Sequence, residues 1–404
     1  MSELNYLEKL LDGAEVEWKS LSELASLRRG RVMSKGYFVD NIGEYPVYSS
    51  QTANSGMIGS IDTFDFDGEF VSWTTDGANA GTVFYRTGKF SITNVCGLIK
   101  INDNSPLNYK YLFYWLSIEA KSHVYSGMGN PKLMSHQVEK IPVPIPCPNN
   151  PEKSLAIQSK IVRILDKFTA LTAELTAELN IRKKQYNYYR DQLFSFNTED
   201  VPHLPMGQKD IGEFIRGGTF QKKDFIDAGV GCIHYGQIYT YYGTYTEKTK
   251  TYISTALAKK CKKAQKGDLI IATTSENDED VCKAVAWLGS EDIAVSSDAC
   301  IYKHNLNPKY VSYFFQTEQF QNQKRQYITG AKVRRVNADN LSKILIPVPS
   351  MEIQERIVSI LDKFDTLTNS ITEGLPREIE LRQKQYEYYR DLLFSFPKPD
   401  SVTN

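Results

Sequence analysis

A length of 404 residues, with 48 Lys and Arg against 48 Asp and Glu, gives a neutral chain long enough for two or three domains. Hydrophobic residues make up 41% and charged residues 24%, which is typical of a soluble globular protein. No run of eighteen apolar residues occurs, and the start, MSELNYLEKLLDG, lacks the basic flank, apolar stretch and cleavage site of a signal peptide. We therefore expect neither export nor membrane insertion.

The elements expected in the first half end in a long helix. Residues 69–75 (EFVSWTT) and 81–86 (GTVFYR) are predicted strands, because they are rich in β-branched or aromatic residues and bounded by Gly or Asp. The next element is one helix over 107–120. The Pro-rich run 141–153 (IPVPIPCPNNPEK) is expected to stop the preceding strand and to lead stiffly into the long helix.

The second half follows the same order. Strands are expected at 267–274 (GDLIIATT) and 284–289 (AVAWLG), followed by one helix over 307–325 with Asn307 as N-cap and Pro308 as first helical residue. The run IPVPS at 346–350 then leads into a second long helix, which Gly374 and Pro376 are expected to kink or break.

The chain is a two-fold repeat. Its longest matches pair IVRILDKF (161–168) with IVSILDKF (357–364) and RKKQYNYYRDQLFSF (182–196) with RQKQYEYYRDLLFSF (382–396). Fainter matches pair LNYKYLFYW from Leu107 with LNPKYVSYF from Leu306, the two IPVP runs, and LSEL at 21 with IGEF at 211. Each half is therefore a variable segment of about 145 residues followed by a strongly repeated segment of about 50.

Each repeated segment has an apolar seam of alternating four- and three-residue steps. The members are Ile157, Ile161, Ile164, Phe168, Leu171 and Leu175 in the first, and Ile353, Ile357, Ile360, Phe364, Leu367 and Ile371 in the second. One such seam alone is compatible with an ordinary core helix. Two nearly identical seams in one chain favour mutual antiparallel packing.

Motifs that would indicate catalysis are absent from the sequence. There is no phosphate loop, no GxGxxG opening a helix after a strand, no GxSxG elbow and no HExxH. We interpret GMGNP at 127–131 as a turn, and the acidic run SENDED at 275–280 as a solvated loop rather than a metal site. A chain of this size without a catalytic constellation is expected to serve recognition or assembly.

Cysteines and charge add two constraints. Six scattered cysteines, with no CxxC pair and no His at zinc-like spacing, predict reduced, mostly buried thiols in a cytoplasmic protein and no metal: Cys96, Cys147, Cys232, Cys261, Cys282 and Cys300. Residues 201–350 carry 20 Lys and Arg against 15 Asp and Glu, a net of +5, whereas residues 1–150 carry 13 against 16, a net of −3. Because a phosphate-contacting surface is local, a neutral total leaves nucleic acid open as a partner.

The candidate binding residues lie in loops rich in polar, basic and aromatic groups. Arg forms bidentate bonds to guanine or phosphate, Lys supplies a point charge, and Tyr and His both stack and hydrogen-bond. For any single residue a solvated turn or a satisfied core tyrosine is an alternative, so the set is stronger than its members. The candidates are Gln51, Thr74, Asp76, Asn79 and Lys132 in the first variable segment, and His234, Tyr235, Gln237, Tyr239, Ser275, Lys332, Arg334 and Arg335 in the second.

With these parts in view, the chain resembles the specificity (S) subunit of type I restriction–modification systems. The resemblance is carried by the twin helix ends QYNYYRDQLFSF and QYEYYRDLLFSF, the IPVP entrances leading to IQSKIVRILDKF and IQERIVSILDKF, and VEWKSLSEL near the start. It implies an α+β fold with two α/β target recognition domains related by a pseudo-two-fold repeat and separated by two long helices packed as an antiparallel coiled coil. The segments are then recognition domains at 1–150 and 201–346 and spacer helices at 151–200 and 347–404.

The resemblance also implies a division of labour. This chain reads a bipartite, asymmetric DNA site without catalysis. Two modification subunits, which use S-adenosylmethionine, dock on the helices, and two restriction subunits add ATP- and Mg-dependent translocation and cleavage. No cofactor is expected in this chain itself.

The stretch TALTAELTAELN (169–180) contains the tetrapeptide Thr-Ala-Glu-Leu twice. Four residues lengthen a helix by about 6 Å and turn it by about 40°, and one base pair turns DNA by roughly 34–36°. In the family such copies are understood to set half-site spacing, so the expected spacer residues are Thr172, Leu175, Thr176 and Leu179. The second spacer has the longer, degenerate DTLTNSITEGLPREIE instead.

Two other classes remain open from the sequence. One is the specificity component of a restriction–modification enzyme outside type I, distinguished by the subunits that co-purify. The other is a tandem-domain scaffold that binds protein or carbohydrate through its aromatic loops. A scaffold of this kind predicts no salt-dependent affinity for duplex DNA.

Overall fold

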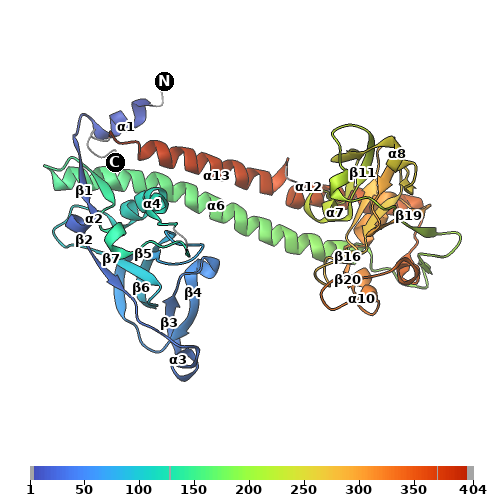
Figure 1. The fold of residues 1–404 in the computed structure, drawn as a ribbon, viewed down its shortest axis with the longest axis horizontal. Helices are drawn as coiled ribbons and strands as arrows, with labels where there is room; N and C mark the ends of the chain where they lie inside the picture. Colours follow the sequence, from blue (N-terminus) through green and yellow to red (C-terminus); the bar gives the residue numbers. More distant parts are fainter. Residues whose placement is uncertain (1–3, 127–128, 371, 398–404) are drawn as a thin grey trace. The chain divides into compact units, whose positions relative to one another are not determined.

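The computed structural model describes residues 4–126, 129–370 and 372–397, which form two compact units. Unit 1 combines residues 1–173 with 381–404, and unit 2 comprises residues 174–380. Each unit therefore contains one variable domain, the first part of the helix that follows it, and a helix stretch that belongs to the other repeat. The repeated segments form α6 (Pro151–Leu193), α12 (Met351–Asn369) and α13 (Gly374–Leu393), and the division between units in α6 falls inside the first Thr-Ala-Glu-Leu copy (Figure 1).

Unit 1 is built on a six-stranded sheet of order β2-β7-β5-β6-β3-β4, with a separate ribbon of β1 and β8. Its strands are β1 (Val16–Ser20), β2 (Ala25–Arg29), β3 (Ile42–Tyr48), β4 (Met57–Ile61), β5 (Phe66–Thr74), β6 (Val83–Ile92), β7 (Cys96–Ile101) and β8 (Pro142–Pro146). Its helices are α1 (Leu4–Leu11), α2 (Leu21–Leu24), α3 (Lys35–Asp40), α4 (Tyr109–Glu119) and α5 (Ser135–Val138), with short 3-10 turns at η1 (Ala53–Gly56) and η2 (Ala120–His123).

Unit 2 has a five-stranded sheet of order β10-β19-β15-β17-β12, a four-stranded sheet β13-β11-β18-β14, and two ribbons, β16-β20 and β21-β9. Its strands are β9 (His203–Pro205), β10 (Gly212–Arg216), β11 (Val230–Ile233), β12 (Tyr245–Thr246), β13 (Thr251–Ile253), β14 (Lys263–Ala264), β15 (Leu269–Ala272), β16 (Thr274–Ser275), β17 (Ala284–Trp287), β18 (Ile293–Val295), β19 (Ala299–His304), β20 (Arg334–Arg335) and β21 (Leu345–Pro347). Its helices are α7 (Tyr235–Thr240), α8 (Thr255–Ala258), α9 (Pro308–Phe314), α10 (Glu318–Arg325) and α11 (Ala338–Leu341), with a 3-10 turn at η3 (Lys222–Asp224).

The two sheets share four antiparallel strands. β2-β7-β5-β6 in unit 1 corresponds to β10-β19-β15-β17 in unit 2, and Thr74 opposite Cys96 matches Ala272 opposite Ala299. The match of LSEL with IGEF is wrong by three residues, because the carbonyls of Leu24 and Ile211 are the ones that accept equivalent bonds, from the backbone of Asn102 and Asn305. The strands predicted in both variable segments are confirmed, whereas the second sheet of unit 2 was not predicted.

The Pro-rich entrances are themselves strands, contrary to the expectation that they end one. β8 pairs antiparallel with β1, and β21 pairs with β9 in the same way. Each is a two-stranded ribbon, so every strand in it is an edge and proline's missing N–H is tolerated. The ribbon fixes the point from which each long helix starts.

The same hydrogen bonds fasten each variable domain to the helix that follows it. In unit 1, Gln158 Oε1 accepts from the Asn108 backbone (2.9 Å), and Asp166 accepts from Lys110 Nζ and the Tyr114 hydroxyl (both 2.7 Å). In unit 2 the corresponding distances are 2.9, 2.8 and 2.7 Å, with the same residue types at each place: Gln354 with Asn307, and Asp362 with Lys309 and Tyr313. The two halves of the chain thus share these hydrogen bonds as well as their sequence.

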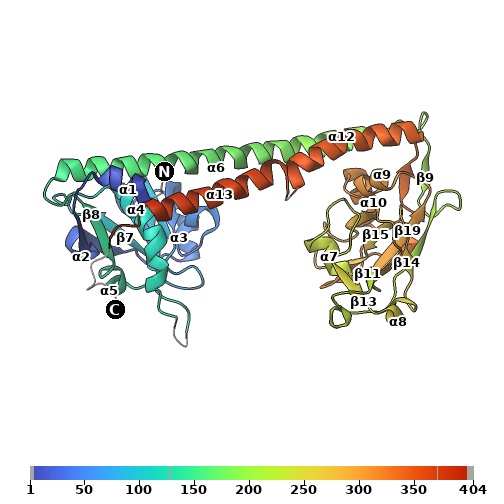
Figure 2. The same ribbon diagram turned by 90° about the horizontal axis from the view of Figure 1, so that it is seen from above.

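The predicted seams divide into two parts. Ile157 and Ile161 are buried in a core cluster of unit 1 that also includes Leu393 of α13, whereas Ile353 is 40% exposed, so the prediction of a buried seam is wrong at Ile353. Farther along, Phe168 stacks on Tyr389 of α13 at 5.4 Å. Figures 1 and 2 show the parts of α6 and α13 that belong to unit 1 side by side and running in opposite directions.

The helix ends are exchanged between the repeats. Phe394, from the end of the second repeat, packs on Tyr111 and Trp115 of unit 1 at 5.1 and 5.7 Å. Phe194, from the end of the first repeat, stacks on Tyr310 of unit 2 at 4.7 Å. Each domain is therefore completed by the helix end that the other repeat supplies.

Two breaks distinguish the observed helices from those expected. The helix predicted over 307–325 is two helices, because the Thr317 hydroxyl accepts from Phe320 N (3.2 Å) and starts α10 after α9 has ended. The caps at Asn307 and Pro308 and the break between α12 and α13 before Gly374 are as predicted. The expectation of one helix per variable segment is wrong, since several short helices accompany α4 and α9.

Within the described ranges, no helix is both long and apolar enough to span a bilayer. Residues 127 and 128 of the predicted GMGNP turn, and Ile371 at the end of the second seam, lie outside the described residues.

Candidate nucleic-acid interface

Four segments of unit 1 meet at one end of the shared strands, around Arg29. Arg29 ends β2, and its guanidinium donates to the Asn94 carbonyl from Nε (3.2 Å) and Nη2 (2.7 Å). The same Nη2 donates to the Thr75 hydroxyl at 3.3 Å. Leu133 N in turn donates to the Thr75 carbonyl at 2.9 Å, which brings the loop of Lys132 to the same place. We call Arg29, Arg31, Thr75, Asp76, Asn94 and Lys132 the strand-end surface of unit 1.

Unit 2 repeats this arrangement around Arg216. Arg216 ends β10, and its Nε donates to the Ser297 carbonyl at 3.2 Å, as Arg29 does to Asn94. Val336 N donates to the Thr273 carbonyl at 3.2 Å, which matches the bond from Leu133 to Thr75. The strand-end surface of unit 2 is Arg216, Thr273, Ser275, Ser297, Arg334 and Arg335.

Both arginines are followed by a glycine for the same steric reason. A Cβ at Gly30 would lie 2.0 Å from the Ile92 carbonyl oxygen, and one at Gly217 would lie 2.1 Å from the Ser296 carbonyl oxygen. No side chain is tolerated at such distances, so the backbone after each arginine runs directly against the neighbouring loop. The backbone after each arginine therefore has an equivalent close contact in the two units.

Lys132 and Arg335, both predicted contacts, are at equivalent positions. Lys132 exchanges backbone bonds with Tyr125 at 2.8 and 3.0 Å, and Arg335 exchanges bonds with Thr329 at 2.9 Å in both directions. The β16–β20 ribbon then places Ser275 opposite Arg334, so three of the predicted residues of unit 2 lie together. Lys132 and Arg335 are exposed, and Lys332 is an exposed member of the same loop.

The acidic run is solvent-exposed, as expected, and one of its carboxylates pairs with an arginine. Arg334 Nε forms an ion pair with Asp278 at 2.8 Å, and its Nη1 donates to the Gly330 carbonyl at 2.5 Å. No group of three or more His, Cys, Asp or Glu side chains in the described chain is placed to hold a metal ion. The run therefore orients an arginine of the strand-end surface.

The remaining candidates of unit 1 have mixed environments. Thr74 is buried, and its hydroxyl donates to the Asn79 carbonyl, so this side chain supports the 74–79 loop from within. Asp76 accepts from Thr75 at 2.6 Å and lies 4.0 Å from Lys132 Nζ. Gln51 is half-buried and donates to the Met57 carbonyl at 2.6 Å.

In unit 2, His234 and Gln237 are buried parts of a helix cap. His234 Nδ1 accepts from Gly236 N (3.2 Å), and Gln237 Oε1 accepts from His234 N (2.9 Å), which together satisfy the start of α7. Burial lowers the pKa of His234, so its ring is neutral at physiological pH. These two residues are structural in this conformation, whereas Tyr235 and Tyr239 are only half-buried and lie one turn apart on α7.

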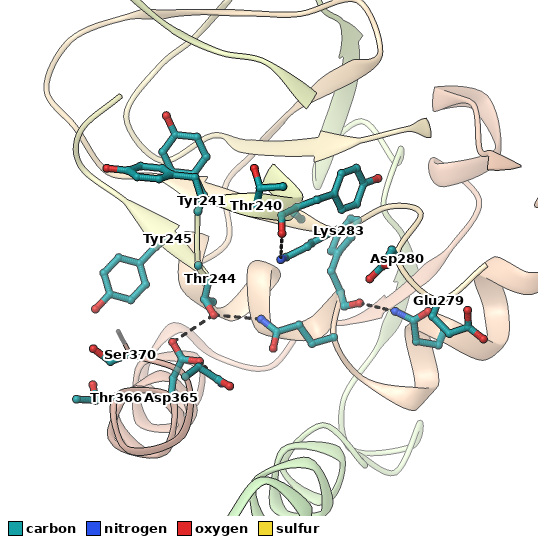
Figure 3. A pocket seen from close by; sticks show the side chains of 18 residues that line it. Thr240, Tyr241, Thr244, Tyr245, Glu279, Asp280, Lys283, Asp365, Thr366 and Ser370 are labelled. Carbon is teal, nitrogen blue, oxygen red and sulfur yellow. Dashed lines mark hydrogen bonds between the residues drawn. The ribbon is translucent and has the colours of Figure 1, made fainter. Parts of the chain in front are cut away.

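Tyr239 connects the strand-end surface to a cavity of about 710 Å³ in unit 2 (Figure 3). Its hydroxyl donates to the Thr274 carbonyl at 2.8 Å, and burial raises its pKa. The cavity is also lined by Tyr241, Tyr245 and Asp365, and the Asp365 carboxylate accepts from the Thr244 hydroxyl at 3.3 Å. Its aromatic wall is the feature that a carbohydrate- or protein-binding scaffold would use.

Most of the cysteines are buried, as predicted. Four of the six are buried, and all six are unpaired: Cys96, Cys147, Cys232, Cys261, Cys282 and Cys300. Burial raises the pKa of the Cys96 thiol to about 11 and that of Cys282 to about 12, so both are protonated and inert at neutral pH.

Sequence reasoning missed Arg29 and Arg216. The available signal was an arginine followed by glycine near the start of each half, in LRRGR and FIRGG. The faulty LSEL–IGEF match hid it, because that alignment does not bring the two Arg-Gly pairs together. Arg31, which forms an ion pair with Asp65 at 3.0 Å, lies in the same basic stretch.

These features define a class of protein: a duplicated chain with two α/β domains, each bearing a basic loop surface, and a pair of repeated helices. The family described as the type I restriction modification DNA specificity domain matches residues 14–182 and 205–381. The chain belongs to this family and is a type I restriction–modification specificity subunit with two specificity domains.

Curated relatives match over the full length. The type I restriction enzyme EcoR124I/EcoR124II specificity subunit of Escherichia coli is 41% identical over 417 aligned residues, which cover 100% of both chains. A putative type I restriction enzyme specificity subunit of Haemophilus influenzae is 33% identical and covers 97% of this chain and 98% of its own.

Solved structures share the fold. The S subunit of the type I restriction–modification system of M. genitalium has a TM-score of 0.55 at 14% identity, over 96% of this chain and 98% of that one. A chain from work on complex assembly and conformational transition of the type I R-M system has a TM-score of 0.60 at 12% identity, over 94% and 97%. The α+β fold with two domains and paired antiparallel helices is thereby confirmed, and neither alternative class is favoured.

Proposed function

We propose that this chain reads an asymmetric, bipartite DNA site, one half-site through each strand-end surface, and that it performs no catalysis itself. The observation that carries the proposal is the pair of equivalent arginines, Arg29 and Arg216, each of which donates from Nε to an equivalent loop carbonyl. Arginine and lysine side chains in such positions contact phosphates and fix the register of a protein on duplex DNA.

The residues around the two arginines differ between units, which supports reading of two different half-sites. Unit 1 has Asp76 and Lys132 where unit 2 has the buried Thr274 and the exposed Arg335. A carboxylate accepts from cytosine, whereas arginine donates to guanine, so the two surfaces favour different bases. Two domains that share the same strands but differ in their loops are expected to bind an asymmetric DNA site.

The proposal includes the partners. Two modification subunits dock on the repeated helices and two restriction subunits complete the assembly, with S-adenosylmethionine, ATP and Mg bound by those partners. Type I specificity subunits among the relatives support the assignment. The duplication supports the two-fold number of partners, because each docking surface on the repeated segments occurs twice.

The test uses the full chain co-expressed with a modification subunit from the same genome, and two matched variants. Lys132→Gln and Arg335→Gln each remove one charge at equivalent positions, and each is expected to lower the slope of log affinity against log salt by about one phosphate contact. Lys89→Gln, at an exposed lysine of β6, is the control and is expected to leave the slope unchanged. Salt-independent binding by the unsubstituted complex would contradict the proposal.

A further inference from the structure

Arg86 is a buried cation in the core of unit 1. It lies in the middle of β6 and is only 4% exposed. Its guanidinium is centred 3.6 Å from the ring of Tyr48 and 4.4 Å from the ring of Phe84, and its Nε donates to the Ser72 hydroxyl at 3.0 Å. The side chain is thus held firmly from three sides.

The charge of Arg86 has no counter-ion. In the described part of the chain no carboxylate forms an ion pair with it, and Nη2 is buried without a hydrogen-bond partner. Burial lowers the pKa of this guanidinium, although an arginine stays protonated in proteins at any ordinary pH. A buried, unpaired charge opposes folding, so a residue of this kind needs a reason other than stability.

The fold does not require a cation at this place. In the register of the shared strands, Arg86 of β6 corresponds to Trp287 of β17, since Ser72 opposite Phe84 matches Ile270 opposite Val285. Trp287 is 2% exposed in an apolar cluster. In unit 2 an aromatic side chain occupies the position that a cation occupies in unit 1.

A short loop, Ser49–Gly56, covers Arg86. A Cβ at Gly56 would lie 3.2 Å from Arg86 Nη2, so the loop backbone comes directly over the unpaired nitrogen. Asn54 and Ser55 adopt left-handed conformations, with φ of 49° and 52°, which are unfavourable for residues with a side chain. The covering segment is therefore strained where it closes.

The same loop borders the strand-end surface of unit 1 and carries the predicted contact Gln51. Its Ser49 hydroxyl bonds to the Thr93 hydroxyl at 2.8 Å, and Thr93 precedes Asn94, whose carbonyl receives Arg29. DNA bound at Arg29 would thus meet the Ser49–Gly56 loop next.

We propose that Arg86 is a DNA-contacting residue of unit 1: when the Ser49–Gly56 loop moves aside, its guanidinium donates to an acceptor atom of the first half-site, on a phosphate or on the edge of a guanine. The inference rests on the proposed function and names a residue that the second unit lacks. The nucleic acid then neutralises the guanidinium charge of Arg86 and supplies the missing acceptor for Nη2.

The test compares Arg86→Met, Arg86→Lys and the control Lys89→Met, an exposed lysine three residues farther along β6, in the full chain co-expressed with its modification subunit. Thermal unfolding and affinity for the selected duplex are measured on each. Arg86→Met keeps an unbranched side chain and removes the charged guanidinium, so we expect an unchanged or higher unfolding midpoint and an affinity lower by about tenfold or more. Arg86→Lys is expected to retain part of the affinity.

The two acceptors are separated by sequence dependence. Contact with a phosphate predicts equal loss on all duplexes and a salt slope reduced by about one, whereas contact with guanine predicts relaxed preference at a single position of the first half-site. A lower unfolding midpoint with unchanged affinity makes Arg86 structural and overturns the inference, as does no change in either. If the unsubstituted complex fails to bind duplex DNA, the proposed function itself is at fault, and the inference fails with it.

Discussion

Phe394 provides the sharpest prediction about how the chain folds, because it lies near the C-terminal end of the sequence and in the core of the N-terminal unit. It is 5% exposed and packs on Tyr111 and Trp115. Removing a buried phenyl ring costs about 3–5 kcal/mol, so Phe394→Ala is expected to destabilise unit 1 by that amount. For a unit of about 200 residues, each kcal/mol lowers the midpoint by about 2–4 °C, which gives a shift of roughly 6–20 °C.

Limited proteolysis during a thermal ramp, with the fragments identified by mass spectrometry, shows which unit opens first. Phe394→Ala is expected to expose cleavage sites in residues 1–173 before those in unit 2. Phe194→Ala is the reciprocal control, since Phe194 is 1% exposed and stacks on Tyr310, and it is expected to open unit 2 first. Opening of unit 2 by Phe394→Ala, or no shift in unit 1, would refute the exchanged helix ends.

Three further predictions concern the spacer and two titrating groups. Deleting Thr176–Leu179 removes four helical residues, a turn of about 40° beyond one full rotation, so the preferred gap is expected to shrink by about one base pair; site selection on the variant checks this, and altered half-sites would contradict it. Burial raises the pKa of the Asp365 carboxyl above its usual 3.8, so the fold disfavours the ionised form. The stability that this carboxyl contributes is therefore present below pH 3.8 and is lost as the pH rises through the raised pKa. Asp365→Asn is therefore expected to raise the unfolding midpoint at pH 7 but not at pH values below 3.8, and a lower midpoint at pH 7 would count against it. Burial lowers the pKa of His304 from 6.5 to about 4, so the neutral ring contributes stability above pH 6.5, and this contribution is lost as the pH falls from 6.5 towards 4. His304→Gln is expected to flatten the curve of unfolding midpoint against pH over this interval. An unchanged curve would exclude His304 as the cause of the pH dependence.

The repeat and most local elements were predictable because they depend on short-range patterns. The strands of both domains, the Asn307 cap and the break before Gly374 follow from propensity, capping and helix-breaking residues. The exchange of helix ends did not follow. Phe194 and Phe394 stand in nearly identical sequences, so either end fits either domain, and only the topology of the folded chain decides between them.

The candidate site was predictable in part. Lys132 and Arg335 lie exposed on the strand-end surfaces, where charged residues in Gly-containing loops are expected, and Ser275 and Arg334 lie beside Arg335 and are half-buried. His234 and Gln237 belong to a helix cap, and this is a physical ambiguity, since the side chains that cap a helix are the same polar types that contact a base.

Strand register, which pairs residues far apart in the sequence, was needed to identify Arg29, Arg216 and Arg86. Their importance lies in which carbonyl, ring or glycine stands opposite each one. No local pattern contains that information, and the one sequence comparison that approached it was shifted by three residues.

The central claim is that one chain reads two half-sites with two domains. The most direct measurement is selection of bound sequences from a random duplex pool, using the full chain co-expressed with a modification subunit from the same genome. The account predicts two short, different blocks of selected bases separated by a gap of fixed length and free sequence. A single block, two blocks at variable separation, or retention of all sequences with an affinity that simply fades as salt rises would contradict it.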